Sequence, residues 1–181
     1  MTMRKWLPVL ATLAVMALTV LGGFAVAGAL SEPAGPPVQV GGAVTVFPLS
    51  GWTDTGEGDL GDLAGARITR GTSTLDVLTR PTELTPEAIL VRYIQRFLRP
   101  AARSLQVSED VREVPLAGGL MGLRVSYVGS FGERASEVEG EVTVAVSPTG
   151  SAAIFDAWGP SGQFAYSLGD TREMTRTAEV S

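Results

Sequence analysis

The chain has no cysteine among its 181 residues. Disulfides, cysteine nucleophiles and thiolate metal sites are therefore excluded, and so is lipid attachment through a lipobox cysteine. A globular body of about 145 residues buries close to 70% of the surface that its unfolded chain exposes, so it is stable without a covalent crosslink. Any attachment to a membrane must come from the peptide itself.

Histidine is also absent, and the only lysine is Lys5. These absences exclude Ser-His and Cys-His nucleophile systems, an exported Ser-Lys system, and zinc sites built from histidine or cysteine. No residue has an unperturbed side-chain pKa close to neutral pH, where general acids and bases work best. We expect a protein that is not an enzyme and has no cofactor. The remaining catalytic alternative is hydrolysis by a pair of carboxylates.

Positive charge is scarce after the first thirty residues. Residues 31–181 contain 12 arginines against 19 aspartates and glutamates, which gives a net charge of −7. This balance argues against binding to nucleic acid.

A long uncharged run is present at residues 6–30, directly after Arg4 and Lys5. A helix of about 20 apolar residues already spans the roughly 30 Å hydrocarbon core of a bilayer. The two basic residues before the run predict a cytoplasmic tail at residues 1–5 and an extracytoplasmic C-terminal portion. The alternative is a cleaved signal peptide, because residues 25–29 offer small-x-small cleavage patterns, and a cleaved chain is secreted. Both interpretations export the body of the protein.

Residues 31–42 are rich in proline and glycine, which predicts a short stalk before a single domain at residues 43–181. The domain opens with β-branched and aromatic residues at 44–47, which predict a strand, followed by a hairpin around Gly71-Thr72. Strands are predicted at 122–128, 137–146 and 151–158, with a further edge strand at 111–114. Within 137–146 the valines alternate with glutamates and a threonine, which predicts one packed face and one solvated face.

A helix is predicted to start at Thr85-Pro86-Glu87, where threonine caps, proline takes the first helical position and glutamate favours the positive helix end. Apolar residues then recur every three or four positions as far as Phe97. Pro100 predicts an end or a kink near Arg99, and residues 171–180 predict a weak terminal helix. The expected fold class is α+β: an antiparallel β-sheet packed by one amphipathic helix and a C-terminal helix, preceded by an N-terminal transmembrane helix.

This order of elements resembles the PsbP-like α/β/α sandwich superfamily, which includes exported actinobacterial proteins of the LpqN type. The resemblance covers residues 43–180 and depends on Phe47-Pro48 with Gly51-Trp52, on Thr85-Pro86-Glu87, and on residues 156–160. It implies a non-enzymatic accessory or binding protein and offers no shared catalytic motif.

Three patterns are candidate sites. An acidic, glycine-rich loop offers oxygen ligands for Ca²⁺, although its spacing departs from the EF-hand pattern; its residues are Asp54, Glu57, Asp59 and Asp62. Steps of four, three and four residues place a set of arginines on one helix face, where they suit anionic headgroups or a phosphate-bearing envelope polymer; these are Arg92, Arg96, Arg99 and Arg103. Trp52 and Trp158 are candidates to line a groove. Each pattern also has a structural alternative. The acidic residues form a surface loop, the arginines form a solvated helix face, and the tryptophans fill the core.

We therefore expect a non-catalytic binding or accessory domain, tethered to the membrane and working through an envelope protein or an anionic lipid or polymer. The alternatives are a domain that binds a small ligand or Ca²⁺ and, more remotely, a carboxylate hydrolase.

Overall fold

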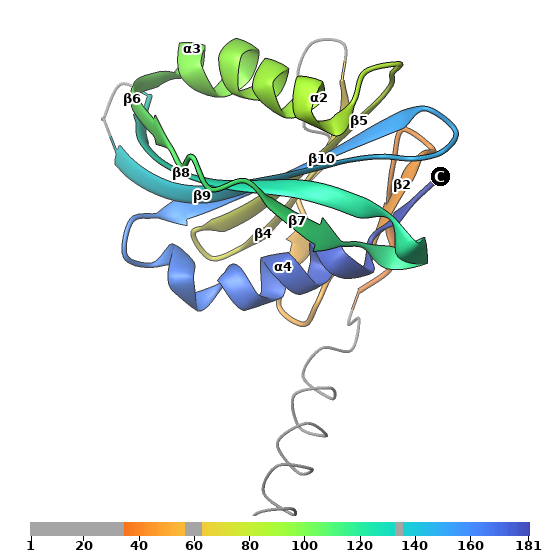
Figure 1. Ribbon diagram of the computed structural model, residues 1–181. Helices are drawn as coiled ribbons and strands as arrows, with labels where there is room; N and C mark the ends of the chain where they lie inside the picture. The colour runs from red at the N-terminus through yellow and green to blue at the C-terminus, as the bar shows by residue number, and fades with distance from the viewer. Residues whose placement is uncertain (1–34, 57–62, 133–135) are drawn as a thin grey trace, which may run out of the picture. The chain divides into compact units, whose positions relative to one another are not determined.

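The computed structural model describes residues 35–56, 63–132 and 136–181 (Figure 1). The predicted tail, the apolar run at 6–30 and the start of the stalk lie outside these residues, so the N-terminal transmembrane helix stays a prediction. In the part of the chain that is described, no helix has the length and hydrophobicity needed to cross a membrane. Residues 33–181 form a compact unit with its own hydrophobic cores, so a fragment of these residues is expected to fold by itself.

An eight-stranded antiparallel sheet is the centre of this unit. Its strand order is β3-β4-β5-β10-β9-β8-β6, and β7 also pairs with β8. The strands are β3 (Thr53–Asp54), β4 (Ala64–Arg70), β5 (Ser73–Pro81), β6 (Ala102–Val107), β7 (Arg112–Pro115), β8 (Met121–Phe131), β9 (Ser136–Val146) and β10 (Ser151–Pro160). β4 and β5 form the predicted hairpin, which turns at Gly71 with a φ of 59° that favours a residue without a Cβ.

One face of the sheet is covered by a helical segment of three consecutive parts (Figure 1). These are α2 (Pro86–Tyr93), a π-helical turn (Ile94–Leu98) and α3 (Arg99–Ala101). Its start is confirmed: the Thr85 hydroxyl accepts a hydrogen bond from the backbone N–H of Ala88 at 3.4 Å. The segment ends at Ala101, directly after Pro100, which cannot donate a backbone hydrogen bond.

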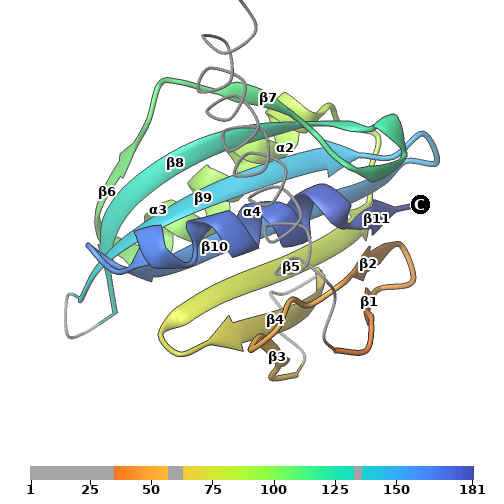
Figure 2. The ribbon, with the colours of Figure 1, turned by 90° about the horizontal axis from the view of Figure 1, so that it is seen from below.

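The opposite face is covered by α4 (Leu168–Thr177), which crosses the sheet in Figure 2. Its buried residues Thr171, Met174 and Thr175 recur at helical spacing and form the stripe that faces the sheet. The helix begins three residues earlier than the sequence predicts. The fold is a mixed α+β fold with helices on both faces of an antiparallel sheet.

A small second sheet has the order β1-β2-β11, with β1 at Val38–Val40, β2 at Val44–Val46 and β11 at Glu179–Val180. Val38 and Val40 are buried in the core. This differs from the predicted stalk, because residues 38–40 belong to the folded domain and the chain enters it before residue 43. The strand is only three residues long, and its local sequence does not reveal its partners.

The prediction of one solvated face for β9 is wrong where α4 covers it. Glu141 and Thr143 are buried, with 8% and 3% of their surface exposed. The first seven residues of β5 are also all buried. Both strands lie in the middle of a sheet that has a helix on each side, so their outward faces also belong to a core.

Candidate functional site

A pocket of about 260 Å³ lies between the helical segment and the sheet. An engineered cavity of about 150 Å³ is large enough to hold benzene, so this pocket has room for a small organic molecule. Most of its wall is apolar and aromatic, and one part of it is charged. The lining residues are Arg67, Asp76, Tyr93, Phe97, Leu98, Ala101, Tyr127, Phe131, Val138, Asp156 and Trp158.

The aromatic wall comes from the helix and from β8. Tyr93 and Phe97 stack with their ring centroids 5.5 Å apart, and Tyr127 meets Phe131 edge to face at 6.2 Å. Phe97 belongs to the π-helical turn, after which the N–H of Arg99 donates to the carbonyl of Ile94, five residues back rather than four. Wide turns of this kind recur at functional sites, and here both Phe97 and Leu98 line the pocket.

Asp156 lies at the buried side of the pocket, with 4% of its surface exposed. Its two carboxylate oxygens accept hydrogen bonds from the hydroxyls of Tyr93 at 2.7 Å and Tyr127 at 2.8 Å. Burial raises the pKa of Asp156 to about 7, and the two hydrogen bonds, which favour the charged form, do not outweigh it. Burial also raises the pKa of both tyrosines, so they remain donors.

Asp76, unlike Asp156, has a positively charged hydrogen-bond donor. Arg67 donates to both of its oxygens, from Nε at 2.6 Å and from Nη2 at 2.9 Å, and the indole N–H of Trp158 donates at 3.0 Å. Arg67, Asp76 and Asp156 are directly opposite one another on β4, β5 and β10. Side chains opposite one another share a face, so the sheet register places all three at the pocket.

Two carboxyl groups in one pocket are also what a glycoside hydrolase requires. Here both oxygens of Asp156 accept from tyrosines, and both oxygens of Asp76 accept from Arg67. A general acid must direct its proton at the substrate, whereas this arrangement holds each carboxylate as an acceptor within the protein. Both carboxylates are therefore engaged by groups of the protein itself.

The two tryptophans named as groove candidates lie in different places. Trp158 lines the pocket. Trp52 is buried in the other core, where its indole N–H donates to Asp170 of α4 at 3.1 Å and Arg70 lies over its ring. The two do not share a groove.

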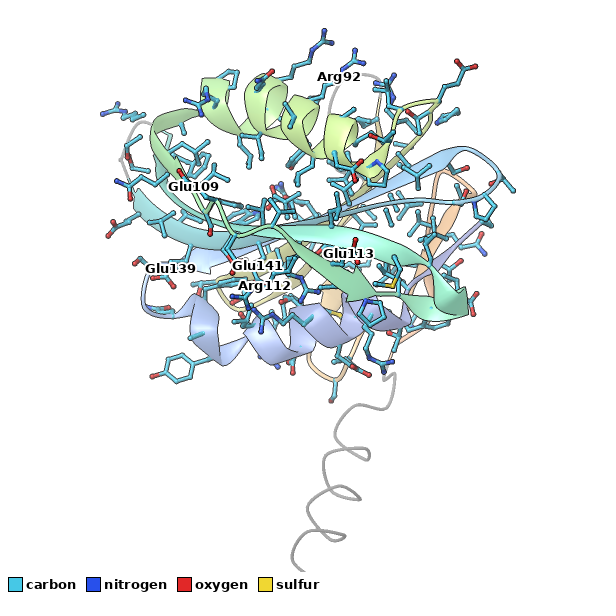
Figure 3. All side chains as sticks on the ribbon, in the orientation of Figure 1. Arg92, Glu109, Arg112, Glu113, Glu139 and Glu141 are labelled. Carbon is cyan, nitrogen blue, oxygen red and sulfur yellow. The ribbon has the colours of Figure 1, made fainter. Side chains whose placement is uncertain are left out.

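The four arginines of the predicted cationic face are divided between two elements. Arg92, Arg96 and Arg99 lie on the helical segment, and Figure 3 shows Arg92 at its outer side. Arg103 is on β6, beyond the helix end, so it does not continue the helical face as the sequence predicted. Among the described residues these four arginines form no ion pair. Their contact with an anionic partner stays a prediction.

Of the acidic loop, only Asp54 is described. It is exposed on β3, and its carboxylate accepts from the backbone N–H of Gly56 at 3.0 Å. Glu57, Asp59 and Asp62 lie outside the described residues. The described ranges contain no group of three acidic, histidine or cysteine side chains placed to hold a metal, and the Ca²⁺ site stays a prediction.

Sequence reasoning did not select the polar residues at this pocket: Arg67, Asp76, Tyr93, Tyr127 and Asp156. A signal for the two aspartates is present. Asp76 and Asp156 are each a single acidic residue inside a strand whose neighbours are apolar. A charge at such a position is buried only where the fold supplies partners for it.

No family model matches the sequence, and none of the curated proteins matches it. Several solved structures do match the structure of this chain. The cyanobacterial PsbP protein of Synechocystis sp. PCC 6803 (CyanoP) matches with a TM-score of 0.57 and 10% identity, over 77% of this chain and 87% of that chain.

LpqN of Mycobacterium tuberculosis, described as involved in cell envelope biogenesis, matches with a TM-score of 0.54 and 13% identity, over 82% of this chain and 86% of its own. The Ran-binding protein Mog1p of Saccharomyces cerevisiae matches with a TM-score of 0.50 and 13% identity, over 82% of this chain and 96% of its own. At such identities the likeness shows the fold alone. It confirms the PsbP-like fold that the sequence resemblance implied.

Proposed function

We propose that this chain is a non-catalytic binding domain that takes a small, largely apolar ligand into the pocket between the helical segment and the sheet. The observation that carries the proposal is the pocket itself: about 260 Å³, with aromatic walls and a few fixed polar groups. Apolar pockets with a small number of placed polar groups are typical of small-molecule sites. The absence of histidine and cysteine and the engaged carboxylates support a binding role rather than catalysis.

The test uses residues 33–181 and three probes of one shape but different charge: choline, 3,3-dimethylbutan-1-ol and 3,3-dimethylbutanoate. At least one probe is expected to bind saturably and to shift the NMR signals of Tyr93, Phe131 and the Trp158 indole. Val138→Trp fills the rim of the pocket and is expected to abolish these shifts. Val128→Trp, also on a strand but exposed and outside the pocket, is the matched control. Failure of all three probes, or equal shifts in both variants, would overturn the proposal.

We also propose that residues 6–30 hold this domain on the outer face of the membrane. The uncharged run and the basic residues before it support this placement, and the envelope role of the similarly folded LpqN is consistent with it. Intact-mass measurement of the membrane-extracted protein tests the anchor. Residues 1–30 are expected to be retained, and a chain that begins near residue 28 or 30 would show cleavage and secretion instead.

A second candidate function is docking of the helical segment on an anionic membrane surface. Arg96 and Arg99 are exposed without ion pairs among the described residues, and Val91 of the same helical segment is 51% exposed. Cationic and apolar side chains on one exposed helix are typical of a surface that contacts anionic lipid.

Flotation with phosphatidylglycerol vesicles tests the docking surface. Changing Arg92, Arg96 and Arg99 to glutamine is expected to abolish co-flotation of residues 33–181. The control changes Arg70, Arg112 and Arg176 to glutamine, which removes the same charge from arginines that are ion-paired. Equal loss in both variants, or no binding by the wild type, would contradict docking through the helix.

A further inference from the structure

The pocket has more negatively charged side chains than positively charged ones. Arg67 and Asp76 neutralise each other through two hydrogen bonds. Asp156 receives only the two tyrosine hydroxyls, and among the described residues no arginine forms an ion pair with it. When Asp156 is ionised, these side chains therefore carry one net negative charge, and the Asp156 carboxylate is itself buried.

The walls around this charge are aromatic. Tyr93, Phe97, Tyr127, Phe131 and Trp158 all line the pocket. Aromatic faces attract cations through the ring quadrupole, and clusters of such rings recognise quaternary ammonium groups. A buried negative charge inside an aromatic wall is complementary to a cation that has an apolar surface.

We propose that the ligand of this pocket is a small organic cation, a quaternary ammonium or alkylammonium compound, whose charged end lies beside Asp156 among the aromatic rings. This inference rests on the proposed binding function and names the class of its ligand. The cation supplies the counter-charge that the fold does not, and its alkyl groups fill the apolar part of the pocket.

Inorganic cations fit less well. Calcium takes six to eight oxygen ligands and magnesium demands a near-octahedral set. Both carboxylates here already accept hydrogen bonds from the protein, and the rest of the wall is mainly carbon. An organic cation needs no such coordination shell.

An anionic ligand is disfavoured as well. Arg67 uses Nε and Nη2 to hold Asp76. An anion would place another negative charge beside the buried Asp76 and Asp156, and like charges repel more strongly near buried groups than in bulk water. The pocket therefore selects against carboxylates and phosphates of the same size.

The three isosteric probes test this choice by NMR titration of residues 33–181 at pH 8. Choline is expected to bind at least about tenfold more tightly than 3,3-dimethylbutan-1-ol, and 3,3-dimethylbutanoate more weakly than either. If the alcohol or the anion binds as tightly as choline, the binding function stands and the organic cation is wrong. If none of them binds, both proposals fail.

Two further measurements assign the effect to Asp156. Asp156→Asn, with its fold checked by the NMR spectrum, is expected to lower choline affinity about tenfold and to lower the affinity for the alcohol by much less. In the wild type, choline affinity is expected to rise between pH 6 and pH 8 as Asp156 ionises. The groups that face it are Arg67 on β4, Asp76 on β5, Tyr93 on α2 and Tyr127 on β8. Choline binding that is independent of pH and of this substitution would overturn the assignment.

Discussion

Gly140 makes room for the Tyr127 ring, which lines the pocket. A Cβ built at this position would lie 2.4 Å from Cζ and 2.6 Å from the hydroxyl oxygen of Tyr127, its partner across the strands. Only a residue without a side chain therefore leaves space for the Tyr127 ring in the position from which its hydroxyl reaches Asp156. The identity of one strand residue decides whether a hydrogen bond at the pocket forms.

Gly140→Ala is predicted to displace the Tyr127 ring, to destabilise the domain by about 1–3 kcal/mol through overpacking, and to weaken choline binding. Urea unfolding and NMR titration measure the two effects. Gly169→Ala is the matched control, because nothing lies within 4 Å of its added Cβ and it is in α4. The free energy of unfolding of the control is expected to equal that of the wild type or to be higher by up to about 1 kcal/mol. An alanine at 140 that leaves both stability and binding intact would show that Tyr127 does not depend on this glycine.

Single residues could be predicted from the sequence where their partners are close in the chain, but not where their partners are distant. Local rules predicted the Thr85 cap correctly, because its hydrogen bond joins residues three apart. Asp156 and its partner Tyr93 are 63 residues apart, and the register of several strands has to be known before they can be placed together. Periodicity indicates which residues are buried, but it does not indicate which buried polar groups meet.

At the level of elements, β9 and α4 are joined by an ion pair between the buried Glu141, labelled in Figure 3, and the half-exposed Arg172. Arg172 donates to both oxygens of Glu141, at 2.9 and 2.5 Å, and Arg124 lies 3.7 Å away. Burial raises the pKa of Glu141, but the hydrogen bonds and charge of Arg172, with the charge of Arg124, outweigh it and hold the pKa below its usual value.

Arg172→Ala is predicted to destabilise the domain by about 1–2 kcal/mol, because the buried carboxylate of Glu141 loses its closest hydrogen-bond donors. The loss is limited because Arg172 is half-exposed, so solvent already screens its charge. Urea unfolding measures the change. Arg176→Ala removes the same side chain one turn later in α4, where the pair with Glu173 is more exposed, and is expected to change stability by no more than about 0.5 kcal/mol. Equal effects of the two substitutions would mean that Glu141 does not hold the helix.

Elements with strong local signals were predicted well, and those defined by distant partners were not. The hairpin around Gly71 and the three long strands follow from alternation and turn residues. The short strand β1 pairs with β2 through a tight turn, whereas β11 pairs with β2 from the other end of the domain. Strands of two or three residues carry no periodicity that would predict either pairing. The solvated face expected for β9 is wrong for the same reason, because no local pattern indicates that α4 returns to cover it.

At the scale of the whole molecule, the missing histidine makes the pH dependence of stability simple. Among the described residues, Asp156 is the group whose pKa is raised to about 7. An aspartate in the unfolded chain has a pKa of about 4. Between these values the folded protein binds a proton that the unfolded chain releases, so the free energy of unfolding falls as pH rises, by at most about 1.4 kcal/mol per pH unit.

Glu141 acts in the opposite direction. Its lowered pKa contributes stability that is present above the unfolded-state value of about 4.3 and is lost as pH falls further. The two groups together predict a stability maximum near about pH 4, a decline from there to about pH 7, and little change from there to about pH 8.5. Urea unfolding at half-unit pH steps measures this profile on residues 33–181. Asp156→Asn is expected to remove the decline between pH 4 and 7 and to leave the acid limb unchanged; a decline of the same size in this variant would place the titrating group elsewhere in the chain.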